Sequence, residues 1–146
     1  MYHLAQLNIA RLLKPIDHPQ IKEFVDNLDR INELAEQSDG FVWRLKDETG
    51  NATAISLFND PLIIVNMSVW ESIPHLKSFV YDSNHKEIMR KRRNWFEKPT
   101  EPHMVLWWVV AGHTPSPEEA KQMLLHLTRH GPTKRAFTFQ QVFPPL

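Results

Sequence analysis

The chain has 146 residues, which suits one domain and is short for two, and its 42% hydrophobic and 23% charged residues are typical of a folded globular protein. The absence of cysteine excludes a disulfide framework, thiol catalysis and a thiolate metal site, and only four glycines are present, which disfavours a phosphate-binding glycine loop. Seventeen basic and seventeen acidic residues balance, so the overall charge does not favour nucleic acid or an acidic membrane as a partner.

The first half of the chain predicts a strand, a long helix and two or three further strands. The side chains of residues 3–12 alternate in the pattern typical of a strand. Asp17 and Pro19 then indicate the start of a helix, which ends at Gly40. Residues 41–46 predict a short strand, residues 52–58 a weak one, and residues 62–70 a strong β-branched one. The apolar residues of the helix recur at the 3.6-residue period, as Ile21, Phe24, Val25, Leu28, Ile31, Leu34 and Ala35.

The second half predicts further helices around one more buried strand. Ser72 and Pro74 begin a helix, and Asn84 with Glu87 resembles a capping box for another, which ends at Pro99. Residues 103–111 have almost no polar residue, which favours a strand covered on both faces. Ser116-Pro117-Glu118-Glu119 is a strong helix start, with serine as N-cap and proline at the first position. That helix ends at Gly131-Pro132, and residues 135–143 predict a last strand.

The predicted order is β-α-β-β-α-β followed by an appended α-β unit. The first six elements form the ferredoxin-like pattern, an α+β fold with an antiparallel sheet and both main helices on one face. We expect residues 1–146 to form one such domain. The other face of the sheet then has no cover, and function should be sought there.

Strand parity assigns side chains to the two faces, because alternate residues of a strand point to opposite sides. The purely apolar sets are expected beneath the two main helices: Ala5, Leu7 and Ile9, and Ile63, Val65, Met67 and Val69. The alternate sets are expected on the bare face: Gln6, Asn8 and Ala10, and Leu62, Ile64, Asn66, Ser68 and Trp70. Parity does not decide the faces of residues 41–46.

A bare face of this composition predicts a homodimer. It is too apolar to face water in a monomer and carries too many amides to be a plain core. A second copy that packs its sheet face on the first leaves a cavity with apolar and polar walls. Such a cavity suits a small, flat, partly apolar ligand.

Four stretches of the chain resemble a known bacterial family. They are Gly40–Leu45, Ser68–Glu71 with Phe79 and His85, Val105–Val109 with Gly112–Pro115, and His130–Thr133 with Ala136–Phe139. The chain resembles the domain of unknown function 3291 family in these stretches, and the resemblance extends over nearly the whole chain. The resemblance implies a fold of the dimeric α+β barrel superfamily, which also holds antibiotic-biosynthesis monooxygenases and haem-degrading monooxygenases.

The resemblance suggests candidate site residues. Haem-degrading members carry an Asn on the first strand, a Trp ending the third and a His on the next helix, and Asn8, Trp70 and His85 occupy comparable elements. Cofactor-independent members place Trp, Asn, Tyr and Arg around an aromatic substrate. We therefore take Asn8, Asn66, Trp70 and His85 as candidate catalytic residues, and Trp43, Arg44, Ser68 and Tyr81 as candidate substrate-binding residues.

Three functions follow as alternatives. The first is a monooxygenase-like enzyme, without a bound cofactor, acting on a small aromatic substrate between sheet and helices. The second is a dimer that only binds a small ligand. The third is a haem protein that binds iron through His85. It is less favoured, because the residues Asp82-Ser83-Asn84 interrupt the spacing between Trp70 and His85.

Other features predict no additional site. His126 and His130 have a metal-compatible i,i+4 spacing, but no third ligand is evident, and basic residues are favoured near a helix C-terminus. The basic residues between Lys86 and Lys98 are expected on a solvated helix face, and the RNA-recognition signature is absent from residues 62–70. With no signal peptide and no apolar stretch long enough to span a bilayer, we expect a cytoplasmic protein without nucleic-acid or membrane partners.

Overall fold

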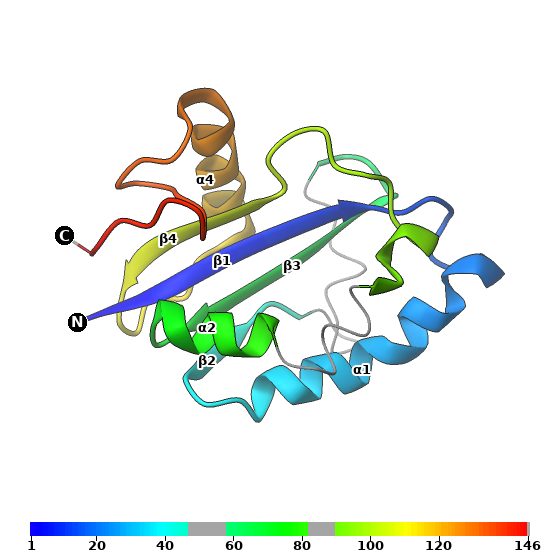
Figure 1. Cartoon of the computed structure of the whole chain (residues 1–146), viewed down its shortest axis with the longest axis horizontal. Helices are drawn as coiled ribbons and strands as arrows, with labels where there is room; N and C mark the ends of the chain where they lie inside the picture. Colours follow the sequence, from blue (N-terminus) through cyan, green and yellow to red (C-terminus); the bar gives the residue numbers. More distant parts are fainter. Residues whose placement is uncertain (47–57, 82–89, 146) are drawn as a thin grey trace.

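The computed structural model describes residues 1–46, 58–81 and 90–145, and it contains a four-stranded antiparallel sheet of order β2-β3-β1-β4 (Figure 1). The strands are β1 (Tyr2–Arg11), β2 (Phe41–Arg44), β3 (Ile63–Trp70) and β4 (Met104–Val110). This order, with helices between β1 and β2 and between β3 and β4, is the ferredoxin-like topology that the sequence predicts.

The helices begin where the sequence provides caps. Helix α1 (Lys22–Glu36) follows a 3-10 turn η1 (Pro19–Ile21), and α2 (Ile73–Val80) is capped by Ser72, whose side chain accepts a hydrogen bond from the His75 amide. Helix α4 (Pro117–His130) has Ser116 as its N-cap, accepting from the Glu119 amide at 3.0 Å. Gly131, at φ 71°, ends α4.

The two faces of the sheet are assigned the opposite way from the prediction. Ala5, Leu7, Val65, Met67 and Val69 do not lie beneath the two main helices. They pack with the inward residues of β4 against α4, through Ala120, Leu124 and Leu127. The prediction failed because it left one face bare, whereas α4 covers that face and needs an apolar surface of its own. Figure 1 shows α4 beside β4, apart from α1 and α2.

The face toward α1 and α2 carries the mixed set of side chains. Its apolar part joins Leu4, Trp70 and Leu106 to Ala35 of α1 and Leu76 of α2. A third cluster at the other end places Phe24 of α1 against Leu62 and Ile64. Between these ends lie the amide and hydroxyl side chains that were expected on an uncovered face. We call this face of the sheet, which α1 and α2 cover, the helix side. We call the opposite face, which α4 covers, the α4 side.

One predicted element is shorter than expected. The predicted last strand is reduced to a bridge, in which Phe137 and Leu106 exchange backbone hydrogen bonds of 2.9 and 2.8 Å along the edge of β4. Of the helix predicted from Asn84 to Pro99, residues 84–89 lie outside the described residues, and the described part has Arg90 in a helix, the 3-10 turn η2 (Arg92–Asn94) and the buried Trp95. The predicted strand 52–58 lies outside the described residues except for Phe58. Among the helices described, none is long and apolar enough to cross a membrane.

Candidate functional site

A strip of polar side chains crosses the helix side of the sheet. The register of β1 and β3 places Gln6 opposite Ser68 and Asn8 opposite Asn66, so these four side chains share one face. The register of β2 and β3 adds Arg44, which pairs with Ser68. We call Gln6, Asn8, Asn66, Ser68 and Arg44 the polar strip. Strands β1, β2 and β3 each contribute one or two of its members, so the regular sheet fixes their spacing.

The inner part of the polar strip is a closed hydrogen-bond network. The Gln6 side-chain Nε2 donates to Asn66 Oδ1 at 2.7 Å and to Ser68 Oγ at 2.9 Å, and Trp70 Nε1 donates to Ser68 Oγ at 2.8 Å. Gln6 and Ser68 are only 5% and 6% exposed. Because Ser68 Oγ accepts two hydrogen bonds, its own hydroxyl proton is left to donate. Gln6 uses both N–H donors, which fixes the orientation of its amide.

Trp70 supports this network from the protein interior. Its side chain is fully buried, stacks on Phe79 with ring centroids 5.3 Å apart, and meets the edge of Phe41 at 5.5 Å. Its one hydrogen-bond donor is used on Ser68. Trp70 is therefore placed to hold Ser68 rather than to touch a ligand.

Arg44 carries the positive charge of the polar strip. Its Nε donates to Glu36 Oε1 at the end of α1 over 2.7 Å, and its side chain is 14% exposed. The ion pair joins β2 to α1 and orients the guanidinium at the edge of the strip. The remaining guanidinium N–H groups can donate to an anionic ligand.

The outer end of the polar strip is open to solvent. Asn8 and Asn66 are both exposed, although they lie on the face that α1 covers. Helix α1 packs on this face near its two ends, through Phe24 and Ala35, while Leu28 and Ile31 between them are half-buried. A small ligand can therefore meet the amide groups of Asn8 and Asn66 with an apolar helix surface nearby.

The other candidate residues are not gathered here. A β-bulge between Phe41 and Trp43 sends these two side chains to opposite faces, so Trp43 packs on the α4 side with the cluster around Leu124. Tyr81 lies at the C-cap of α2 and is 56% exposed. His85 lies outside the described residues, so haem binding through it stays a prediction.

Two residues of the site were missed as candidates. Gln6 belonged to the same parity set as Asn8, and its position opposite a serine would have been the signal. Glu36 gave no signal, because its pairing with Arg44 depends on how α1 crosses β2. The described residues contain no cluster of three or more histidine and acidic side chains that could hold a metal ion.

Comparisons with known proteins agree with this architecture. Residues 3–146 match the family profile described as Domain of unknown function (DUF3291), whereas no curated protein matches the sequence. A conserved protein from Methanosarcina mazei Go1 is 13% identical, with a TM-score of 0.52 over 75% of this chain and 93% of that one. A protein of unknown function from Nitrosomonas europaea is 15% identical, with a TM-score of 0.52 over 80% of this chain and 97% of that one.

A third similar structure carries a functional name. It is a candidate antibiotic biosynthesis monooxygenase from Nitrosomonas europaea, 9% identical, with a TM-score of 0.50 over 79% of this chain and 94% of that one. At these identities the similarity shows the fold alone. The shared fold is the ferredoxin-like α+β fold with an antiparallel sheet, as the sequence predicts.

Proposed function

We propose that this chain, which belongs to the domain of unknown function 3291 family, is a monooxygenase-like enzyme for a small aromatic substrate bound on the polar strip. The observation that carries the proposal is the contrast within the strip. Its inner members, Gln6 and Ser68, are buried and hydrogen-bonded, while its outer members, Asn8 and Asn66, are exposed. A rigid, satisfied inner network holds the open amide groups in fixed positions, as a binding or catalytic site requires.

The chemistry follows from the donors that the polar strip presents. Asn66 Nδ2, the Asn8 amide and the Arg44 guanidinium can donate to an oxygen that becomes negative when a phenol or enol ionises. The ionised substrate supplies the electrons for oxygen reduction. Overall, a CH₂ group and O₂ give a carbonyl group and water, so one oxygen atom enters the product and the other leaves as water. Ionisation releases the substrate proton to solvent through the open end of the strip, and a proton is taken up from solvent again when the second oxygen atom leaves as water.

The individual roles follow from exposure. Asn8 and Asn66 are the candidate catalytic residues, because they are exposed on this face and carry donors that hold no internal partner among the hydrogen bonds described. Trp70 and Gln6 are positioning residues that act through Ser68 and Asn66. Arg44, held by Glu36, stabilises the substrate anion.

Oxygen uptake with anthrone tests this proposal, because anthrone has an acidic CH₂ group that oxidation converts to a carbonyl. We expect uptake to be faster with the protein than without it. Asn66→Ala should slow it by roughly tenfold or more, since a donor to the developing anion is lost. Asn66→Asp should slow it further, because a carboxylate repels the anion. Asn94→Ala, a surface asparagine on η2, is the matched control and should leave the rate unchanged.

A dimer that only binds a small ligand is the alternative, favoured by one observation. Among the described members of the polar strip and its immediate partners, the only carboxylate is Glu36, and it is already paired with Arg44. These residues therefore offer no free carboxylate that could take a proton from a substrate. The same experiment separates the two functions. Quenching of tryptophan fluorescence by the ligand without oxygen uptake would favour binding alone. The absence of both quenching and oxygen uptake would contradict the site itself.

A homodimer through the sheet remains part of the proposal, now through the α4 side. Trp43, Leu45 and Phe58 are only partly buried there, although they pack against the core, and they lie toward β2, away from the strands that α4 contacts. Light scattering should give twice the mass of the chain. Trp43→Lys should shift the mass toward the monomer, while a monomer in the unmodified protein would contradict this interface.

A further inference from the structure

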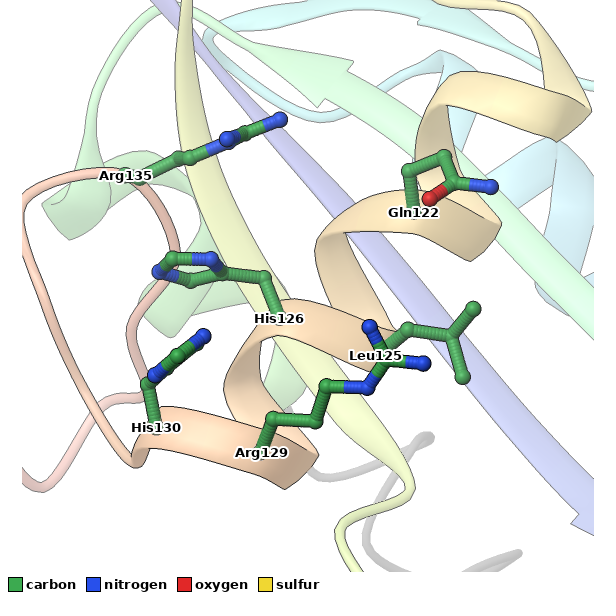
Figure 2. Close-up of a pocket in the computed structure, with 6 residues that line it drawn as sticks. All are labelled: Gln122, Leu125, His126, Arg129, His130 and Arg135. Carbon is green, nitrogen blue, oxygen red and sulfur yellow. The ribbon is translucent and has the colours of Figure 1, made fainter.

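A second group of side chains forms a pocket far from the polar strip, on α4. The pocket has a volume of about 230 Å³ and opens at the surface. Figure 2 shows its lining, which comes from the last turns of α4 and from the loop that follows: Gln122, Leu125, His126, Arg129, His130 and Arg135. The lining thus includes two arginines and two histidines, with the two imidazole rings near each other and the arginine side chains extending to either side of them in Figure 2.

None of the residues that line the pocket is acidic, and the nearest described carboxylate bonded to the lining is Glu118, whose Oε1 accepts from Gln122 Nε2 at 3.0 Å. The sequence contains no Asp or Glu after Glu119, so the last 27 residues carry only basic charged side chains. Among the described ion pairs, none involves Arg129 or Arg135. The pocket thus concentrates positive charge in a chain whose basic and acidic residues are equal in number.

The loop that carries Arg135 is tied to α4. Thr133 Oγ1 lies 2.9 Å from His126 Nε2 and also accepts a hydrogen bond from the Arg135 amide at 3.2 Å. The Thr133 amide in turn donates to the Ala136 carbonyl at 2.8 Å. The backbone at Arg135 is therefore held beside the helix by local bonds, so the loop needs little ordering when a ligand enters.

The electrostatics of the pocket disfavour a cation and favour an anion. The His126 and His130 rings lie 4.6 Å apart between centroids. Burial, followed by the nearby His130 and Arg135, lowers the pKa of His126 below its usual value. A metal ion at the two imidazoles would meet two guanidinium groups, whereas an oxyanion would relieve the repulsion among all four.

Attraction of basic residues to the C-terminus of a helix explains only part of this arrangement. It accounts for Arg129 and His130, which lie in the last turn of α4. It does not account for Arg135, which comes from the following loop and lines the same pocket. Convergence of the two segments on one space is the feature that points to a ligand.

We propose that this pocket binds the phosphate group of a small phosphate monoester, with Arg129 and Arg135 donating to its oxygens and the two histidines lining its other side. Guanidinium groups suit phosphate because their N–H donors match pairs of its oxygens. The volume leaves space beside the phosphate for a small organic group. This site is independent of the polar strip, because α4 packs on the opposite face of the sheet.

Histidine NMR of the full chain tests the proposal, with inorganic phosphate as the first probe. We expect saturable shifts of the His126 and His130 ring protons, and a rise in the pKa of His126 when phosphate binds. Arg135→Gln and Arg129→Gln should each weaken binding about tenfold, the effect of losing one charged hydrogen-bond donor. Arg30→Gln, which removes an exposed arginine of α1, should change nothing. Equal shifts from sodium chloride at matched ionic strength, or unchanged binding by Arg135→Gln, would overturn the site.

Two further probes test the ligand class and the role of the histidines. Phenyl phosphate should bind at least as tightly as inorganic phosphate, and weaker binding would contradict the monoester assignment. Sulfate, whose charge is constant in this range, should bind more tightly at pH 6 than at pH 8, because protonation of His126 then adds a positive charge beside the two arginines. Equal affinity at both pH values would exclude His126 from the site. Neither result depends on oxygenase activity.

Discussion

The two faces of the sheet are both covered, but they are built differently. On the α4 side, the buried residues of β1, β3 and β4 are all apolar, and they pack against the apolar stripe of α4. On the helix side, apolar clusters at the two ends enclose the polar strip. An apolar face needs no explanation beyond stability. A buried amide and hydroxyl cost stability unless they are paired, and here Gln6, Ser68 and Trp70 supply one another's partners.

The largest expected effect is on the α4 side. Trp107 is 1% exposed, and its Nε1 donates to Glu119 Oε2 at 2.9 Å. Trp107→Ala should lower the free energy of unfolding by about 3–5 kcal/mol, because it leaves a large cavity between sheet and helix. Urea denaturation measures this loss. Trp107→Phe keeps most of the packing and should cost clearly less, and equal losses would show that the hydrogen bond, not the packing, dominates.

The next effect concerns the contact of α2 with the end of β2. Gly40 has φ 82°, and a Cβ atom there would lie 2.2 Å from His75 Cγ. Gly40→Ala should therefore lower the free energy of unfolding by roughly 2–4 kcal/mol, from backbone strain and steric overlap together. Gly112 has φ 96° with no atom near its Cβ position, so Gly112→Ala isolates the backbone cost. Equal thermal stabilities of the two variants would contradict the importance of the His75 contact.

The polar strip should respond as a coupled network. Ser68→Ala should cost about 1–3 kcal/mol, because it leaves the buried Trp70 Nε1 without its acceptor. Trp70→Phe removes that donor instead. In a double-mutant cycle measured by urea denaturation, the two changes together should cost less than the sum of the single changes. Additive losses would indicate that the hydrogen bond contributes nothing to the fold.

The smallest effect is a pH dependence at the start of β4. Burial, and then the charge of Arg92, lower the pKa of His103 below its usual 6.5. Below that value the unfolded chain binds more protons than the folded one, so stability falls as pH decreases from 6.5 through the folded pKa. Thermal unfolding between pH 7.5 and 5 should show this loss, with a smaller slope in His103→Gln. An unchanged slope would assign the effect to other groups.

The sequence predicted secondary structure well where local chemistry decides it. Ser116 with Glu119 fixed the start of α4, and the β-branched residues from Ile63 to Val69 fixed β3. Parity also grouped Gln6 and Asn8 with Asn66 and Ser68, which the register confirms. The assignment of these groups to a layer was wrong, because parity divides a strand into two sets without saying which helix covers either set.

The sequence by itself determined the order of elements, the ferredoxin-like topology and the set of amides that share a face, because helix and strand periods are local properties of the chain. Tertiary structure alone decided the rest. The bulge that separates Phe41 from Trp43, the pairing of Arg44 with Glu36, and the approach of Arg135 to His126 all depend on how distant segments pack. The packing of the helices and loops on the sheet selects among arrangements that the local sequence pattern does not distinguish. Both proposed sites lie where segments distant in the sequence pack together.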